Sequence, residues 1–179
     1  MGLDMYLTAK MSLYESDKDL RLAKVRRIFP DMYKSGNINY IHVGFEAGYW
    51  RKANHIHKWF VTNVQEGKDD CGDYYVRRED LMRLLDICKK IIDSTKLKRG
   101  TVCDGYAYEG GKKRPILNEG KILANPELAE VLLPTQGGFF FGSTEYDESY
   151  YSDLKKTIEI IEKCLKLPEC WSFEYHSSW

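Results

Sequence analysis

The segment YWRKANHIHKWF, residues 49–60, places two histidines one residue apart among cations and aromatic rings. His55 and His57 could bind one metal ion only if both rings pointed to the same side, as they would in a strand. The apolar residues of this region instead repeat at helical spacing: Ala53, Ile56, Phe60, Val61 and Val64. Residues two apart on a helix point about 200° away from each other. The sequence therefore predicts that these histidines do not share a metal ion.

The two faces of this predicted helix indicate different roles. His57 falls within the apolar arc, so we predict a core histidine with one hydrogen-bonded ring nitrogen. The opposite arc carries a candidate ligand-binding set: Arg51, Lys52, His55, Lys58 and Trp59. Cations and a titratable histidine beside an indole ring can hold phosphate groups and stack a base. The alternative is a solvated basic face whose side chains lie along a half-covered tryptophan.

An acidic turn follows this helix and holds four side chains that can bind metals: Asp69, Asp70, Cys71 and Asp73. The turn lacks the D-x-D-x-D-G pattern and the distal glutamate of a calcium loop. It also lacks the second C-x-x-C or the histidine pair that a zinc site with Cys71 would need. We therefore interpret it as a solvated acidic turn and assign no metal site.

The glycine-rich segment TQGGFFFGSTEYDESYY, residues 135–151, leads into a helix start, which is the setting of a phosphate-binding loop. It matches neither of the two common phosphate-loop patterns. Three carboxylates, Glu145, Asp147 and Glu148, stand where a phosphate would bind and would repel it. We predict instead that Thr144-x-x-Asp147 caps the helix as a variant of the capping box.

The chain has five cysteines: Cys71, Cys88, Cys103, Cys164 and Cys170. Their odd number, wide spacing and lack of a C-x-x-C motif argue against a disulfide framework and favour a reducing cytoplasm. Nothing in the sequence pairs Cys103 with a base, so we predict no covalent catalysis. Cys88 and Cys164 lie on helical apolar stripes, which is typical of buried, unreactive thiols.

Hydrophobic periodicity predicts the elements that position these residues. Strands are expected where apolar or aromatic residues alternate or cluster, around residues 3–7, 41–45, 74–76, 139–141 and 171–175. Amphipathic helices are expected over residues 53–64, 81–92 and 151–165. Asn125 and Pro126 predict the start of a short helix that reaches Leu132. The glycines and prolines of residues 100–123 predict a hairpin or a long irregular loop.

These elements follow no regular βαβ order and no flexible linker separates them. We therefore predict an α+β fold, a single globular domain over residues 1–179, with a mixed or mostly antiparallel sheet packed by about three amphipathic helices. The 27 basic and 27 acidic residues cancel, so we expect no long nucleic acid as a partner. The sequence shows neither a signal peptide nor an apolar stretch of membrane-spanning length, so we expect no membrane partner.

Four segments of the chain carry a resemblance to known proteins: MGLDMYL at residues 1–7, the stretch from Gly48 to Val76, LPTQGGFFFGSTEYDESYYS at 133–152, and YHSSW at 175–179. On these segments the chain resembles a widespread group of small, mostly uncharacterised bacteriophage-encoded proteins. The resemblance implies a phage accessory protein that acts in the host bacterial cytoplasm. Such proteins are often antagonists of host antiviral defence. The resemblance supplies no catalytic motif and no cofactor.

Three functions are compatible with these features. The first is a protein that sequesters a phosphate-bearing, nucleotide-derived signal on the Arg51 to Trp59 set. The second is an inhibitor of a host defence protein, with Tyr146, Tyr150 and Tyr151 as interface anchors. The third is a metal-dependent hydrolase or nuclease in which distant residues converge: His42, His55, Asp69, Asp70 and Asp73. A homo-oligomer is compatible with each of them, and we favour binding over catalysis because no catalytic residue can be assigned.

Overall fold

The computed structural model describes residues 2–14, 20–31 and 40–179. These residues form six strands and five helices, which confirms an α+β fold. In chain order they are β1 (Asp4–Tyr14), α1 (Leu20–Ile28), β2 (Tyr40–Arg51), α3 (Asn54–Asn63), β3 (Tyr74–Val76), α4 (Arg78–Ser94), β4 (Leu97–Glu109), β5 (Lys112–Leu123), α5 (Glu127–Leu132), α6 (Glu148–Leu165) and β6 (Ser172–Ser178).

Four strands form one antiparallel sheet in the order β2, β1, β6, β3. β1 confirms the strand predicted around residues 3–7 and extends beyond it, because every second residue from Met5 to Leu13 is buried. Successive side chains point to opposite faces of a strand, so this alternation assigns one face to the core. β6 confirms the strand predicted around residues 171–175 and places Phe173 and Tyr175 on the same buried face.

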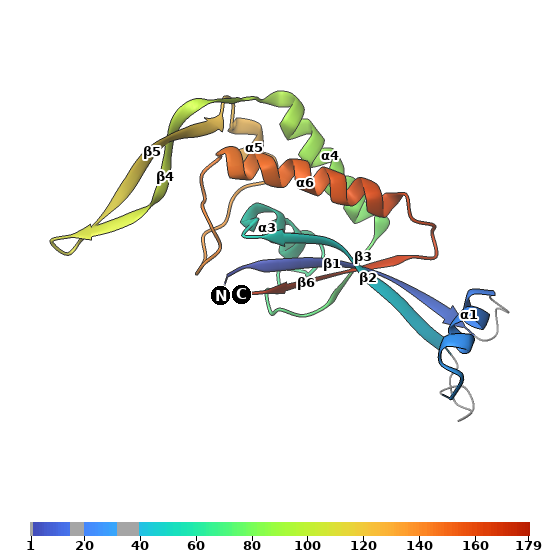
Figure 1. Ribbon diagram of the computed structural model, residues 1–179. Helices are drawn as coiled ribbons and strands as arrows, with labels where there is room; N and C mark the ends of the chain where they lie inside the picture. Colours follow the sequence, from blue (N-terminus) through green and yellow to red (C-terminus); the bar gives the residue numbers. More distant parts are fainter. Residues whose placement is uncertain (1, 15–19, 32–39) are drawn as a thin grey trace.

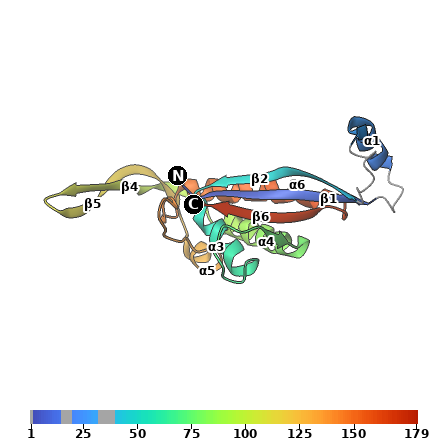
Figure 2. The ribbon, with the colours of Figure 1, turned by 90° about the horizontal axis from the view of Figure 1, so that it is seen from below.

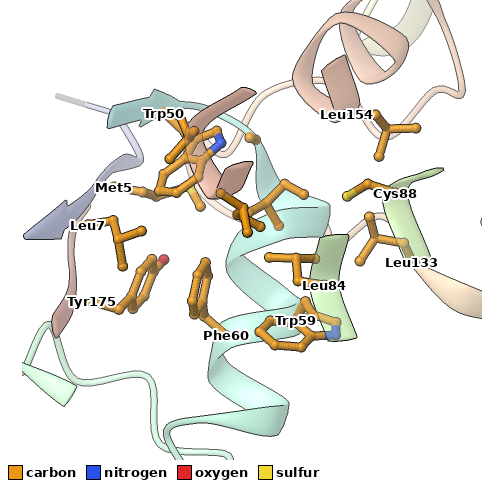
Figure 3. Close-up of a cluster of buried hydrophobic side chains, with 14 of the residues drawn as sticks. Met5, Leu7, Trp50, Trp59, Phe60, Leu84, Cys88, Leu133, Leu154 and Tyr175 are labelled. Carbon is orange, nitrogen blue, oxygen red and sulfur yellow. The ribbon is translucent and has the colours of Figure 1, made fainter. Parts of the chain in front are cut away.

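The main core lies between this sheet and the helices α3, α4 and α6 (Figure 1). All three helices confirm predicted amphipathic segments. Aromatic residues join them to the sheet (Figure 3): the rings of Phe60 in α3 and Tyr175 in β6 stack with their centroids 4.0 Å apart. Trp50 of β2 donates its indole N–H to Thr157 of α6 over 2.9 Å. The sheet therefore fixes the relative positions of α3 and α6.

A ribbon of two antiparallel strands, β4 and β5, projects from one end of this body (Figure 1 and Figure 2). It confirms the hairpin, rather than the irregular loop, over residues 100–123. Gly110 and Gly111 at its turn have φ values of 56° and 76°. A type I′ turn needs positive φ at both central residues, which glycine adopts at no steric cost.

The predicted strand at residues 139–141 is wrong. This segment is a turn in which Phe139 is 82% exposed and only the third ring, that of Phe141, is buried. Phe140 has a φ of 61°, which no residue of a β-ladder adopts. Three aromatic residues in a row favour a strand by propensity, but the glycines on both sides turn the chain away from the sheet.

Two short helices lie beyond the three predicted long ones. α5 begins one residue after Pro126 and confirms the short helix expected there. α1 was not predicted, because it buries a single residue, Leu22, against Met11 and Leu13 of β1, which leaves no amphipathic stripe in the sequence. Among the described helices, none combines the length and the apolar character needed to cross a membrane.

All five cysteines are free thiols. Burial raises the pKa of Cys88 to about 12 and that of Cys164 to about 11, so both thiols stay protonated. This confirms the prediction of buried thiols on the helical stripes. The Cys103 thiol donates to the backbone oxygen of Gly105 at 3.3 Å.

Candidate ligand-binding site

A cavity of about 520 Å³ lies between the corner that joins β2 to α3 and the start of α6. We call it the main cleft. One wall comes from residues 51–55 and the other from residues 142–153. Both walls are attached to the core. Trp50, the residue before the first wall in the sequence, donates a hydrogen bond to Thr157 of α6, the helix that forms part of the second wall.

Arg51 and Lys52 supply the positive charge of the main cleft. Their predicted place on the helix is wrong: Arg51 ends β2, where it pairs with Asp4 of β1, and Lys52 forms a turn with a φ of 59°. The strand continues to this point because the β1 ladder extends to Asp4. The two cations therefore reach the ligand-binding set from the sheet, and His55 reaches it from the helix.

The Lys52 turn fits against a glycine of the opposite wall. Gly142 has a φ of 94°, and a β-carbon there would lie 3.0 Å from both the Cβ and the backbone oxygen of Lys52. A side chain at position 142 is thus excluded by its backbone conformation and by this contact. Glycine adopts this backbone conformation without strain, whereas the left-handed Lys52 is a form of local strain that the surrounding structure must hold.

Asn54 joins the two walls and was not predicted as a site residue. Its side-chain nitrogen donates to the backbone oxygens of Phe141, at 3.2 Å, and Ser143, at 2.8 Å. Its side-chain oxygen accepts from the backbone N–H of Gln136 at 2.9 Å. The sequence offered one signal, an amide residue at the start of a helix, and that signal indicates a helix cap. The side chain binds the distant loop instead.

His55 is 3% exposed and lies at the inner side of the main cleft. Its ring packs against that of Tyr150 with centroids 4.2 Å apart, and its Nε2 atom has no hydrogen-bond partner among the residues that the structure describes. Burial lowers the pKa of His55 to about 3, so the imidazole is neutral at physiological pH. The predicted role as a titratable cation is therefore wrong, although the residue does line the cleft.

Lys58 and Trp59 line a second, smaller cavity of about 180 Å³, which we call the side pocket. Trp59 is 6% exposed and packs edge-on against Phe60, so the predicted open stacking surface is wrong. His55 lines the side pocket as well as the main cleft. Each of the five predicted ligand-binding residues thus borders one of two cavities, and His55 borders both.

The wall from α6 is rich in carboxylates whose charge is partly offset. Asp147 caps the helix by accepting from the backbone N–H groups of Ser149 and Tyr150, so the predicted capping box that starts at Thr144 is wrong. Glu148 pairs with Lys121 at 2.8 Å. Burial raises the pKa of Asp153 to about 7, which leaves this side chain partly protonated at neutral pH.

The three predicted interface tyrosines do not form an exposed patch. Tyr150 is buried and donates its hydroxyl to the backbone oxygen of Leu133 at 3.0 Å. Tyr146 and Tyr151 pack against the main core, and Lys155 lies over the Tyr151 ring at 4.8 Å. Tyr150 is therefore not an exposed interface residue, because its place on α6 turns it toward the core, and an interface role of the half-buried Tyr146 and Tyr151 stays a prediction.

His57 confirms the predicted core histidine and has two partners instead of one. Its Nε2 lies 3.1 Å from Asp69 and its Nδ1 lies 2.8 Å from the Tyr175 hydroxyl. A carboxylate only accepts hydrogen bonds, so Nε2 donates to Asp69; in the neutral ring Nδ1 then accepts from the Tyr175 hydroxyl. Asp69 also accepts from the Trp179 indole at 3.0 Å. The predicted solvated role is thus wrong for Asp69, which belongs to the edge of the core.

The residues of the hypothetical metal-dependent site are spread over separate parts of the molecule. His42 bonds Ser12 in the β1–β2 ladder, whereas His55 lies in the main cleft. Asp70 accepts from Gly72 and Tyr74 within its own turn, which lowers its pKa. In the ranges 2–14, 20–31 and 40–179, no three histidine, cysteine or acidic side chains lie close enough together to hold a metal ion.

Comparison of the chain with protein-family models, with curated proteins and with solved structures gives no match. Nearly all the residues that line the main cleft belong to two of the four sequence segments described above. The two resembling segments at residues 48–76 and 133–152 supply every residue that lines it except Asp153.

Proposed function

We propose that this protein binds and sequesters a nucleotide-type, phosphate-bearing ligand in the main cleft. The observation that carries the proposal is the polarity of the cavity: Arg51 and Lys52 on one wall, and carboxylates on the other. A nucleotide has the same polarity, with anionic phosphate at one end and hydroxyl and amino donors at the other. A volume of about 520 Å³ is within the range of small-molecule sites.

The charge balance of the cleft supports a phosphate at the cationic wall. Of the four carboxylates, Asp147 is occupied as a helix cap, Glu148 is paired with Lys121, and Asp153 is partly neutral. The backbone N–H of Glu145 donates to the Ser143 hydroxyl, and its carboxylate is left without a hydrogen-bonded or ion-paired partner within the described residues. Arg51 is itself paired with the Asp4 carboxylate at 3.6 Å, but its side chain is 59% exposed and has further N–H groups that can bind phosphate.

The acidic wall suits the other end of the ligand. Carboxylates accept hydrogen bonds from ribose hydroxyls, as they do in dinucleotide-binding proteins. We propose that capture, rather than cleavage, is the function, and that the protein removes a nucleotide-derived signal of host antiviral defence. This biological setting rests on the resemblance to phage accessory proteins.

The test is retention of a nucleotide from a mixed panel, followed by heat release and chromatography. We expect retention of one class and its recovery intact. Arg51→Gln combined with Lys52→Asn should abolish retention, and asparagine tolerates the left-handed backbone at position 52. The matched control replaces two cations outside the cleft, Arg99→Gln with Lys68→Asn. Equal retention by both double variants, or no retention by the natural chain, would sink the proposal.

We propose an inhibitor of a host defence protein as the second candidate, with a different surface from the tyrosines. Phe139 and Phe140 are 82% and 52% exposed, and their ring centroids lie 4.2 Å apart. Large exposed aromatic pairs are uncommon without a partner, and such rings anchor interfaces. Phe139→Ser with Phe140→Asn should lose a specific partner in a pull-down from host lysate. Identical recovery by the natural chain and this variant would count against the candidate.

A further inference from the structure

His55 is the point at which the main cleft and the side pocket meet. A buried polar nitrogen without a partner is costly, and native proteins keep few of them. The other histidine of α3, His57, has both nitrogens bonded, so the helix does not leave its histidines unpaired in general. Within α3, the Nε2 of His55 is the buried side-chain polar atom that lacks a partner among the described residues.

The side pocket differs in chemistry from the main cleft. Its walls include the apolar residues Trp59, Leu133 and Pro134, and none of the described residues that line it is a carboxylate. The indole nitrogen of Trp59 points away from Phe60 and makes no hydrogen bond in the described structure (Figure 3). The volume of about 180 Å³ equals that of about six water molecules in the liquid, which is room for one flat ring system. Apolar walls with isolated N–H donors fit a heterocyclic base.

The neutral state of His55 suits this kind of ligand. A neutral imidazole can donate from one nitrogen and accept at the other, whereas an imidazolium can only donate. The edge of a base carries both donors and acceptors, so a neutral ring can match it, while the phosphate remains with Arg51 and Lys52. A single ligand can then contact both cavities, since His55 borders each of them.

We propose that the side pocket is the base-binding subsite of the same ligand, with His55 hydrogen-bonded to the edge of the base and the phosphate held in the main cleft. This assignment rests on the proposed nucleotide-binding function and adds the part of the ligand that sets specificity. The ligand class is a nucleotide with an accessible base, bound by phosphate and base together.

The test compares calorimetric titrations with inorganic pyrophosphate and with ADP, GDP, CDP and UDP. Thr62 lies at the exposed rim of the side pocket, so Thr62→Trp fills the pocket without changing the core. Thr101→Trp, the same change at an exposed position of β4, is the matched control. We expect Thr62→Trp to raise the dissociation constant of the preferred nucleotide by about tenfold or more, which is the scale of a lost base contact. Pyrophosphate binding should stay unchanged, and the control should bind both probes normally.

The possible results separate this inference from the proposed function. The base subsite is overturned if pyrophosphate binds as tightly as every nucleotide. It is also overturned if Thr62→Trp changes the affinity for pyrophosphate and for the nucleotide by the same factor, or changes neither affinity. In each of these cases phosphate binding stands. If no probe binds the natural chain, both proposals fail. Should Thr62→Trp misfold by circular dichroism, Thr62→Leu fills part of the pocket and is judged by the same two titrations.

Discussion

The two faces of α3 hold two buried histidines in opposite conditions. On the face toward β6, His57 binds both Tyr175 and Asp69, so its polar atoms are fully used by the fold. On the face toward α6, His55 packs against Tyr150 and leaves Nε2 unpaired. Burial is almost the same for the two residues, at 0% and 3% exposure. The difference in hydrogen bonding, and not in burial, separates a structural histidine from a candidate binding residue.

This contrast predicts that the two histidines respond oppositely to removal. A polar group with hydrogen-bond partners stabilises the fold, and its removal leaves those partners without hydrogen bonds. An unsatisfied one destabilises the fold and is retained for another reason. The experiments below test the comparison from the largest expected effect on stability to the smallest.

His57→Ala should lower the free energy of unfolding by about 3 kcal/mol. The change opens a cavity and leaves the Tyr175 hydroxyl and the inner oxygen of Asp69 without a partner. Urea unfolding followed by circular dichroism measures it, with the exposed substitution Lys68→Ala as the control. A loss below about 1 kcal/mol would show that the network contributes little, and the comparison between the two faces would fail.

Asn54→Ala should cost about 2 kcal/mol and also weaken ligand binding. The substitution removes three hydrogen bonds. It leaves the backbone N–H of Gln136 and the backbone oxygens of Phe141 and Ser143 without this partner. The loop at residues 136–143 then loses its attachment to α3. Hydrogen exchange should rise in this loop while α4 stays protected. Unchanged exchange in the loop would mean that other contacts hold the second wall of the cleft.

His55→Leu should raise the free energy of unfolding by about 1 kcal/mol while weakening the retained ligand. Leucine is of similar size and has no buried nitrogen without a partner, so the folded state becomes more stable. The same change removes a polar group that the ligand can contact, so ligand binding becomes weaker. Urea unfolding and calorimetric titration on the same preparation measure the two effects. A variant that is less stable by more than about 2 kcal/mol would show that His55 is structural after all.

The pH dependence of stability should reveal His55 and Asp153 separately. Burial holds the pKa of His55 at about 3, so the unfolded chain binds the extra proton and stability falls as pH drops below about 6.5. Burial raises the pKa of Asp153 to about 7, so the folded chain binds the extra proton and stability falls as pH rises from about 4 to 7. Asp153→Asn should flatten the second decline and His55→Leu the first. Urea midpoints from pH 4 to 8 check both, and unaltered slopes would contradict the assignment.

The sequence predicted the elements whose burial is periodic. β1, α4, α6 and β6 bury every second residue or one helical stripe, and that pattern predicts each of them. The apolar spacing also predicts α3, although the structure buries both of its faces. The segment around Phe139 was missed because three aromatic residues satisfy a strand pattern, while the backbone at Phe140 and Gly142 follows the turn. Local propensity cannot detect a contact such as that between Gly142 and Lys52, which lie far apart in the chain.

The candidate site was predicted in its residue types and missed in its geometry. The sequence predicts one helical face for the five ligand-binding residues, Arg51, Lys52, His55, Lys58 and Trp59. In the structure they lie on a strand end, a turn and a helix, and they line two separate cavities. Asn54 and Asp153 were not predicted, because the role of Asn54 depends on the distant loop and the raised pKa of Asp153 depends on its burial in the folded chain. Periodicity describes one element at a time, and a cleft is formed by two.

The pairing of β1 with β6 has a consequence for how the molecule folds. In this ladder Lys10 lies opposite Ser172, so the contact closes a loop that contains almost all the other elements. Contacts between residues so distant in the chain form slowly, because the entropy of closing the loop is lost before the contact stabilises the fold. Tyr175, the partner of His57, belongs to the same strand. We therefore expect the His57 network to be completed in a late step of folding, together with the central sheet.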